Sequence, residues 1–548
     1  MKQNNFYKSI AGVLTALIMI TSCTKLDQHV YSVVPQQDFW QTPQQIKAGI
    51  APGYRALTAI GWGSLFQLVE NSSDEAITPT RGGDWFDGGE WQALWKHTWT
   101  STTSQMNGAW NNIYTGIGRI NFALNSLDNL KEKPDNIASI NAELKVLRAY
   151  FYYLAMDLYG NVPLVIDLNT NPDSVTNSSR QQVYTFIEKE VKDNIAMLSA
   201  NVNASTYGRV TKWMGFSLLA KLYLNAQVYT GTAHWQDCIN VCDSIMGAGI
   251  YSLAPEYFDN FSPNNDASPE NIFVVPFDKV NITGNSFEVR TLHYQSGAQF
   301  GTSGGGNNGT CSLNPFYQLF DTTSVYSTKA GNVYRTYLDQ RSGQWQIGQQ
   351  YNTRYPYPPD KNILYKAADP SLKLTDVATG LDLIFTPDLD TISSPAASFR
   401  MAGVRSIKYF PAPGNLGNQS NDIVLFRYAD ILLMKAECEV RLNQNLPDAL
   451  ALVNQIRERA YSGNISHDWT IADVTLDHIL NERGRELAWE MRRRQDLIRY
   501  EVASSKPYFS AARIPDKNED PSDGHLLIFP IPAQQISANS NLKQNPGY

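Results

Sequence analysis

The feature that most constrains this chain is a set of long segments whose apolar residues recur every three or four positions. Residues 140–158 carry such a series from Ile140 to Leu158. In residues 110–127 the series is Trp110, Ile113, Ile117, Ile120, Leu124 and Leu127. This spacing places apolar side chains on one face of an α-helix, and another element must cover that face. We therefore expect a chain built largely from packed helices.

We expect further helices along the chain, arranged as pairs of neighbouring helices. The predicted ranges are 180–198, 211–229, 234–246, 427–442, 447–461 and 475–500. Small residues such as Ala149, Ala220 and Ala436 recur where two helices would cross closely. The pattern is typical of tetratricopeptide-like helix–turn–helix units, in which each pair buries its apolar face on the next. The predicted fold class is mainly α, a tetratricopeptide-like helix-pair solenoid.

The helical pattern fails over residues 251–425, which are rich in Gly, Pro, Asn and Tyr. Short apolar runs such as Ile272–Val275 predict short strands between loops. We expect a long loop-rich insertion, and such a segment in a compact protein is usually functional. The predicted division is residues 1–22 as a signal peptide, 23–250 as an N-terminal helical part with a Trp-rich loop at 70–100, 251–425 as the insertion, and 426–548 as C-terminal helices with a tail.

The N-terminus has the features of an export signal. Lys2 and Lys8 form a basic region ahead of an apolar run, Ile10–Ile20. As a helix this run spans about 16 Å, which is too short for a ~30 Å hydrocarbon core. The run is followed by Thr21, Ser22 and Cys23, which resembles a bacterial lipobox. We expect cleavage before Cys23 and lipidation of its thiol. Plain signal-peptidase cleavage nearby is the alternative.

Composition and motifs exclude several classes of protein. With 45 Lys and Arg against 52 Asp and Glu, the net charge is −7, so no basic excess is present for binding nucleic acid. The chain contains no His-Glu-x-x-His, Gly-x-Ser-x-Gly or P-loop motif. We expect no cofactor and no metal. Cys238 and Cys242, one helical turn apart, are interpreted as core residues. Gly304–Gly309 has the spacing of a dinucleotide-binding motif, but we do not interpret it as one.

Six segments of the chain share a recognisable set of motifs: 110–121, 147–152, 158–164, 219–224, 427–437 and 482–497. They are followed by Pro530-Ile531-Pro532 and by Asn-Pro-Gly-Tyr at residues 545–548. In this order the segments resemble the SusD/RagB family of outer-membrane nutrient-binding lipoproteins. The resemblance implies a helical fold, a lipid anchor in the outer membrane that faces the cell exterior, and binding of an extracellular glycan. It also implies a partner, a SusC-like TonB-dependent transporter on which the protein sits as a lid.

The charged residues of these segments are expected to be scaffold and not catalytic. They lie on amphipathic helices, where ion pairs would fix the packing at the end of the solenoid. The set is Arg427, Asp430, Glu437, Glu482, Arg485, Glu486 and Arg493.

The candidate binding site lies in the Trp-rich loop. Of 12 Trp, five fall between positions 85 and 110, and glycine pairs flank Trp85 on both sides. No helical or strand pattern would bury Trp85, and Arg81, Asp84 and Asp87 lie beside it. An aromatic ring offers a flat face to the C–H groups of a sugar, and charged side chains bond its hydroxyls. In the resembled family the glycan site lies partly in this region. The alternative is that Trp85 caps the core.

Other aromatic residues are weaker candidates. Trp91, Trp95 and Trp99 are four apart, which favours burial along a helix, although Trp91 is also kept as a binding candidate. Tyr294 and the loop at 297–315 are expected to form a second wall of the site. Trp345 lies between polar residues and is the last binding candidate.

The resulting hypothesis is a surface lipoprotein that captures oligosaccharides for the transporter and does not cleave them. A glycoside hydrolase is one alternative, with Asp84 and Asp87, or Asp388 and Asp390, as its carboxylate pair. A protein-interaction scaffold built from the helix repeats is the other.

Overall fold

A computed structural model of the protein describes residues 39–548, so the signal sequence and Cys23 lie outside the described residues. The chain divides into a unit that ends at Gly49 and a second unit, Ile50–Tyr548, to which the description below refers. Helices hold 46% of the described chain and strands 12%, so the fold is mainly α, as predicted. Within residues 39–548, no helix is both long and apolar enough to cross a bilayer.

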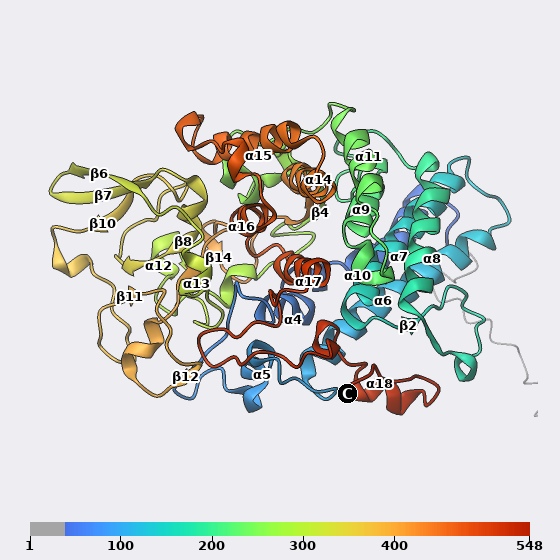
Figure 1. Ribbon diagram of the computed structural model, residues 1–548, viewed down its shortest axis with the longest axis horizontal. Coiled ribbons are helices and arrows are strands. Elements are labelled where there is room, and N and C mark those ends of the chain that lie inside the picture. Colours follow the sequence, from blue (N-terminus) through green and yellow to red (C-terminus); the bar gives the residue numbers. More distant parts are fainter. Residues whose placement is uncertain (1–38) are drawn as a thin grey trace, which may run out of the picture. The chain divides into compact units, whose positions relative to one another are not determined.

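A stack of helices forms one side of the second unit (Figure 1). Each helix packs on the next, in the order α6, α7, α8, α9, α11, α14 and α15. Their bounds are α6 Ser104–Asp128, α7 Ile137–Tyr159, α8 Arg180–Asn194, α9 Lys212–Leu224, α11 Trp235–Met246, α14 Tyr428–Leu442 and α15 Leu446–Ala460. The prediction of a tetratricopeptide-like helix-pair stack is confirmed.

Local chemistry explains where these helices begin and end. Ser179 caps α8 in a reciprocal pair with Gln182, and the Thr211 hydroxyl accepts the backbone N–H of Met214 at the start of α9. Helix α7 ends at Gly160, whose φ of +69° suits glycine, and the chain continues into a short strand, β2 (Val162–Pro163). Glycine at this position therefore allows the chain to leave the helix.

The insertion closes on itself at its base. Strand β4 (Asn271–Val275) pairs antiparallel with β15 (Ile423–Arg427), and both are fully buried. Helix α14 therefore packs directly on α11, although the insertion separates them in sequence. Among the described residues, each sheet has only two or three strands. The remaining insertion strands are β5 Thr302–Ser303, β6 Ser324–Lys329, β7 Asn332–Tyr337, β8 Trp345–Gln346, β9 Gly348–Gln349, β10 Ile363–Lys366, β11 Ile384–Phe385, β12 Ser393–Ser394, β13 Arg405–Ser406 and β14 Gly414–Asn415.

The single helix predicted for residues 475–500 is wrong, because the segment forms two helices, α16 (Leu476–Glu486) and α17 (Arg493–Ser504). Between them Trp489 and Met491 have left-handed backbone with φ near +59° and +58°. The backbone N–H of Trp489 donates to Glu75 at 3.0 Å and that of Met491 donates to Glu70 at 2.6 Å. These carboxyl groups come from a distant part of the chain, so no local pattern reveals the break.

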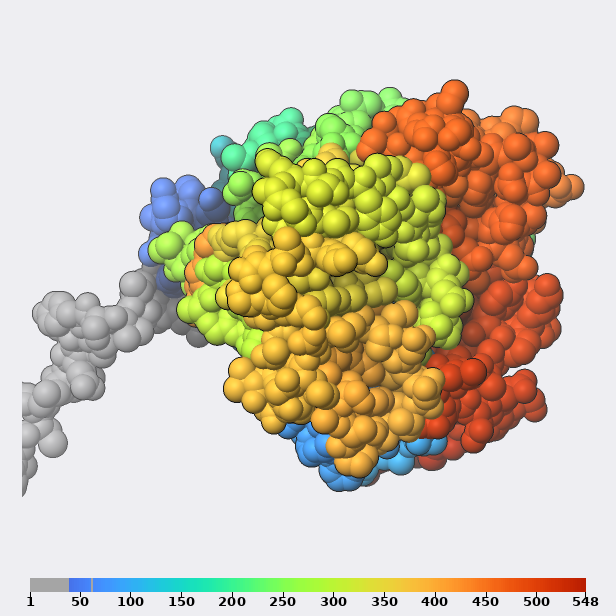
Figure 2. All heavy atoms as spheres, turned by 90° about the vertical axis from the view of Figure 1, so that its left-hand side faces the viewer, coloured from blue at the N-terminus to red at the C-terminus, as the bar shows by residue number. Residues whose placement is uncertain are grey.

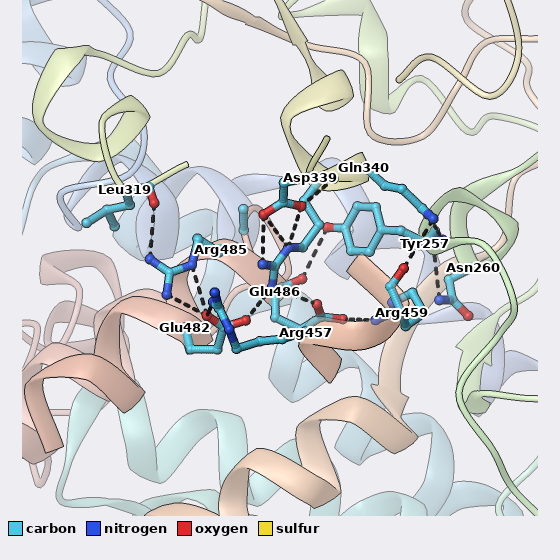
Figure 3. A network of polar contacts seen from close by, with 12 residues as sticks. Tyr257, Asn260, Leu319, Asp339, Gln340, Arg457, Arg459, Glu482, Arg485 and Glu486 are labelled. Atoms are coloured by element: carbon cyan, nitrogen blue, oxygen red, sulfur yellow. Dashed lines mark hydrogen bonds and ion pairs between the residues drawn. The ribbon is translucent and has the colours of Figure 1, made fainter. Parts of the chain in front are cut away.

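Ion pairs fix the C-terminal helices, as predicted. Glu482 and Glu486 on α16 lie among arginines from neighbouring segments (Figure 3). Arg341 of the insertion reaches Glu482 at 2.6 Å, and Arg427 reaches Glu486 at 2.6 Å. Burial alone would raise the pKa of Glu486, but Arg459, Arg427 and Arg341 lower it to about 2. The other charged residues of the predicted set also form ion pairs. These pairs join Asp430 to Arg483, Glu437 to Arg499, Arg485 to Glu482 and Arg493 to Asp74.

The cysteines that the structure describes are core residues, as expected. Cys238, Cys242, Cys311 and Cys438 are buried and carry free thiols. In residues 39–548, no three His, Cys, Asp or Glu side chains gather in a way that could hold a metal ion.

Candidate functional site

A pair of tight turns presents Trp85 at the surface. Arg81 and Asp84 exchange backbone hydrogen bonds of 3.0 and 3.1 Å and so close a turn over Gly82 and Gly83. A second turn follows at Gly88 and Gly89, just before α5 (Glu90–Lys96). Gly82, Gly88 and Gly89 all have φ between +67° and +84°, which glycine adopts readily. The loop geometry predicted from the glycine pairs is therefore present.

Residues from the insertion surround this loop. Strand β1 (Thr80–Arg81) pairs in parallel with β12, which brings the loop beside residues near 390–400. Figure 2 shows the corresponding face, where blue atoms of the N-terminal part emerge beneath the orange part of the insertion. The site is thus assembled from segments that are hundreds of positions apart in the sequence.

The Trp85 ring is half-buried and held in a fixed position. Its Nε1–H donates to the carbonyl oxygen of Asn307 at 2.8 Å. The ring lies against Gly309, where an added Cβ would fall 2.6 Å from ring atoms. Trp91 packs edge-on at 5.9 Å between ring centroids, and the Arg290 guanidinium lies 5.8 Å from the centroids of both rings. Asn307 and Gly309 belong to the loop at 297–315, so this loop lies against the Trp85 ring.

Carboxylates and a phenol lie beside the ring. The Tyr294 hydroxyl donates to Asp84 Oδ2 at 2.9 Å, and Arg400 approaches the same oxygen at 3.1 Å. Asp87 accepts the indole N–H of Trp91 at 2.6 Å. Burial and Asp84 raise the pKa of Tyr294 to about 12, so its hydroxyl remains a hydrogen-bond donor at neutral pH. The structure therefore brings Trp85, Asp84, Asp87 and Tyr294 together.

Three of the predicted site residues are buried. Trp345 is 0% exposed, with its ring 5.4 Å from Phe320, and it belongs to the core. The Arg81 guanidinium is also enclosed and donates to the carbonyl oxygens of Asn308 and Phe399. The expectation that these two side chains contact a ligand is wrong, because neither reaches the surface. Trp91 is buried together with Trp95 and Trp99, as expected, although α5 ends at Lys96 and Trp99 lies beyond the helix. Trp91 packs edge-on against the Trp85 ring.

Two residues at the site were missed by the sequence reasoning, Arg290 and Arg400. Arg290 follows a single 3₁₀ turn at Phe287–Val289, and Arg400 ends another at Ala397–Met401. Neither lies in a pattern that marks it as functional, and both reach the site only through contacts with the Trp85 loop. The sequence around Arg290 and around Arg400 therefore gives no indication that either residue belongs to a site.

Hollows also lie elsewhere on the described part of the chain. One of about 520 Å³ is lined by Trp99, His525 and Tyr548, and one of about 470 Å³ by Arg457, Trp469 and Asn481. We place the candidate site at Trp85 because its loop presents an aromatic ring at the surface, held in a fixed position beside hydrogen-bonding groups.

The fold and this surface define the class of protein. It is a helical-repeat protein whose candidate site combines an aromatic ring with hydrogen-bonding groups, and such a site suits a ligand rich in hydroxyl groups. Comparison with known proteins gives the family. The SusD family matches residues 247–548, and a family described as starch-binding and associating with the outer membrane matches residues 67–224. The chain belongs to the SusD family.

Individual relatives cover nearly the whole chain. A SusD-like protein of Formosa agariphila is 25% identical over 98% of this chain and 99% of its own. The starch-binding protein SusD of Bacteroides thetaiotaomicron is 23% identical over 88% of this chain and 85% of its own. A solved laminarin-binding SusD-like protein superposes with a TM-score of 0.65 at 20% identity, over 93% of this chain and 100% of that one. A surface glycan-binding protein A from Bacteroides thetaiotaomicron, in complex with laminarihexaose, gives 0.64 at 19% identity, over 92% and 99%. These structural likenesses show a shared fold.

Proposed function

We propose that the protein binds an oligosaccharide at the Trp85 surface and releases it uncleaved. The observation that carries this proposal is a half-buried tryptophan fixed between two glycine turns, with Asp84, Asp87 and Tyr294 around it. The ring face suits the C–H face of a sugar, and the carboxylates and phenol suit its hydroxyls. Relatives named for binding starch and laminarin support the same ligand class.

Isothermal titration of the purified protein against a panel of oligosaccharides tests the proposal. We expect saturable binding to one linkage class, and Trp85→Ala should weaken it at least about thirtyfold, because truncating a central aromatic contact typically costs 2 kcal/mol or more. Trp469→Ala is the matched control, since Trp469 is also half-buried and carries an arginine, Arg457, 5.5 Å from its ring. Equal affinity of the Trp85→Ala variant and the wild type would overturn the assignment of the site.

The finer part of the proposal is the destination of the ligand. We propose that Cys23 carries a lipid anchor, that the protein faces the exterior of the outer membrane, and that it passes its glycan to a TonB-dependent transporter. The lipobox-like sequence at Thr21-Ser22-Cys23 and the outer-membrane description of the matching family support this placement. Chemical cross-linking in intact cells, followed by identification of the partner, tests it. Recovery of other proteins alone, without any barrel transporter, would favour the scaffold alternative.

A glycoside hydrolase remains the alternative for the Trp85 site. Its carboxylate pair would be Asp84 and Asp87, which are already hydrogen-bonded to Tyr294 and to Trp91. The titrated mixtures should therefore be examined for shortened products. Intact oligosaccharide supports the binding role, and release of shorter sugars that disappears in an Asp84→Asn variant would establish hydrolysis in its place.

A further inference from the structure

Arg290 is a cation at the candidate site whose guanidinium contacts aromatic rings. It lies over the rings of Trp85 and Trp91, and the surrounding protein partly buries it, which lowers the pKa of the group. No hydrogen bond or ion pair joins this guanidinium to another residue within the described range 39–548. Asp87 is the carboxylate that acts on it electrostatically, and Asp87 is bonded to Trp91. The hydrogen-bond donors of Arg290 are therefore available to a ligand that touches Trp85.

Two further arginines lie buried beneath the site without a carboxylate partner. Arg81 donates to the carbonyl oxygens of Asn308 and Phe399 and to the Cys311 sulfur. Arg405 donates to Asn308 Oδ1 at 2.7 Å and to the carbonyl oxygen of Ala402 at 3.0 Å. Both are 1% exposed or less, and neither has an ion pair with any residue that the structure describes. Carbonyl and amide dipoles and the rings of Phe399 and Phe385 therefore surround these charges in place of carboxylates, and in a poorly solvated interior such charges act over a longer range than in water.

Four arginines and three aspartates have been identified at or beneath the site, so these cations exceed these anions by one. The cations are Arg81, Arg290, Arg400 and Arg405, and the anions are Asp84, Asp87 and Asp376. Among the described residues, Arg400 is the one of these arginines that forms ion pairs, with Asp84 and with Asp376 at 2.7 Å. His293 is buried next to Tyr294 and close to the same arginines. Burial together with Arg405, Arg400 and Arg81 lowers its pKa to about 3.

From this arrangement we infer that the site selects an anionic saccharide, one that carries a carboxylate or a sulfate ester, with Arg290 as the residue that contacts the acidic group. The inference rests on the proposed function and specifies its ligand class. A guanidinium matches the planar oxygens of a carboxylate or the oxygens of a sulfate through two parallel hydrogen bonds. The hydroxyls of a neutral sugar would use the same donors without the Coulomb attraction. The Trp85 ring would then bind the sugar body and Arg290 its charge.

The test compares pairs of oligosaccharides that share a backbone and differ in charge. A galacturonate hexamer and its fully methyl-esterified form supply the carboxylate pair. A sulfated galactan oligosaccharide and its desulfated form supply the sulfate pair, and laminarihexaose and maltohexaose serve as neutral references. Titration of the purified wild type at low and at moderate salt should show at least one acidic probe binding about ten- to a hundredfold more tightly than its neutral counterpart, with the preference weakened by salt.

Two variants identify the residue responsible. Arg290→Gln should bring the affinities for the acidic probe and its neutral counterpart close to each other, whereas Arg290→Lys should retain part of the preference. Arg335→Gln is the matched control, since Arg335 also lies over aromatic rings, those of Tyr337 and Tyr365, but on the β6–β7–β10 sheet. It should leave the preference intact.

The outcomes separate this inference from the proposed function. Tight binding of a neutral probe that Trp85→Ala abolishes, with no gain from an acidic group, would overturn the inference and leave the proposed function standing. An acidic preference that survives Arg290→Gln would overturn the role of Arg290. Failure of every saccharide to bind would overturn the proposed function and the inference together.

Discussion

Replacing Glu437 by glutamine should destabilise the protein far more than the loss of a surface ion pair. Glu437 lies on α14 and is fully buried. It accepts hydrogen bonds from Arg499 at 2.7 Å and from Arg441 at 2.8 Å. Burial by itself would raise the pKa of the carboxyl, but Arg499 and Arg441 lower it from 4.5 to about 2. At about 1.4 kcal/mol for each pH unit, that fall corresponds to about 3 kcal/mol of stability at neutral pH.

The pH dependence has a definite sign. Because the folded-state pKa lies below the unfolded value, the stabilisation by Glu437 is complete above the unfolded pKa and is lost as the pH falls towards 2. A glutamine has the shape of the carboxyl group without its charge and does not titrate. The difference in stability between wild type and Glu437→Gln should therefore narrow by about 2 kcal/mol between pH 7 and pH 3.

Equilibrium urea unfolding, followed by tryptophan fluorescence and circular dichroism, measures this difference. Asp193→Asn is the control, because Asp193 pairs with Lys189 on the exposed surface of α8, where water and salt screen the pair and its loss should change stability little. A loss below about 1 kcal/mol for Glu437→Gln, equal at pH 7 and pH 3, would refute the reasoning that buried ion pairs hold the C-terminal helices together.

Two further predictions concern the break between α16 and α17 and the support of the site. Burial and the Glu70 carboxylate raise the pKa of Glu75 well above 4.5, so this carboxyl contributes a loss of stability as the pH rises from the unfolded-state pKa through the folded-state pKa. In thermal unfolding, Glu75→Gln should therefore gain in stability on the wild type as the pH is raised from 5 to 8. Parallel pH profiles for the two proteins would contradict this. Gly309→Ala should displace the Trp85 ring and weaken saccharide binding by about tenfold or more without unfolding the protein, since the new Cβ would fall 2.6 Å from ring atoms. Gly118→Ala, where no atom lies within 4 Å of the new Cβ, is its control, and equal affinities for the two variants would contradict the prediction.

The helices could be predicted because their signal is local. The three-and-four spacing in residues 110–127 and 140–158 corresponds to α6 and α7 with boundaries a few residues wider. The glycine pairs around Trp85 likewise identify the turns, since a left-handed backbone favours glycine at those positions.

The errors arise where distant segments decide the outcome. Trp345 lies among polar residues, yet Ser342, Gln344 and Gln346 are buried with it because the C-terminal helices cover this part of the insertion. Arg81 is adjacent to an exposed turn, but the acceptors that enclose its guanidinium, Asn308 and Phe399, belong to the insertion. Reasoning from neighbouring residues identifies the loop that carries the site and misses which side chains point inward.

The β4–β15 ladder at the base of the insertion separates the loops that would select a ligand from the helices that stabilise the fold. Once the ladder joins the two ends, lengthening the enclosed loops costs little, about 0.6 kcal/mol of closure entropy for each doubling of length. Arg341 secures the insertion to the helices through Glu482. The loops beyond these anchors can therefore change in length and composition and recognise a different ligand, while the stack of helices, and with it the protein's stability, is left as it was.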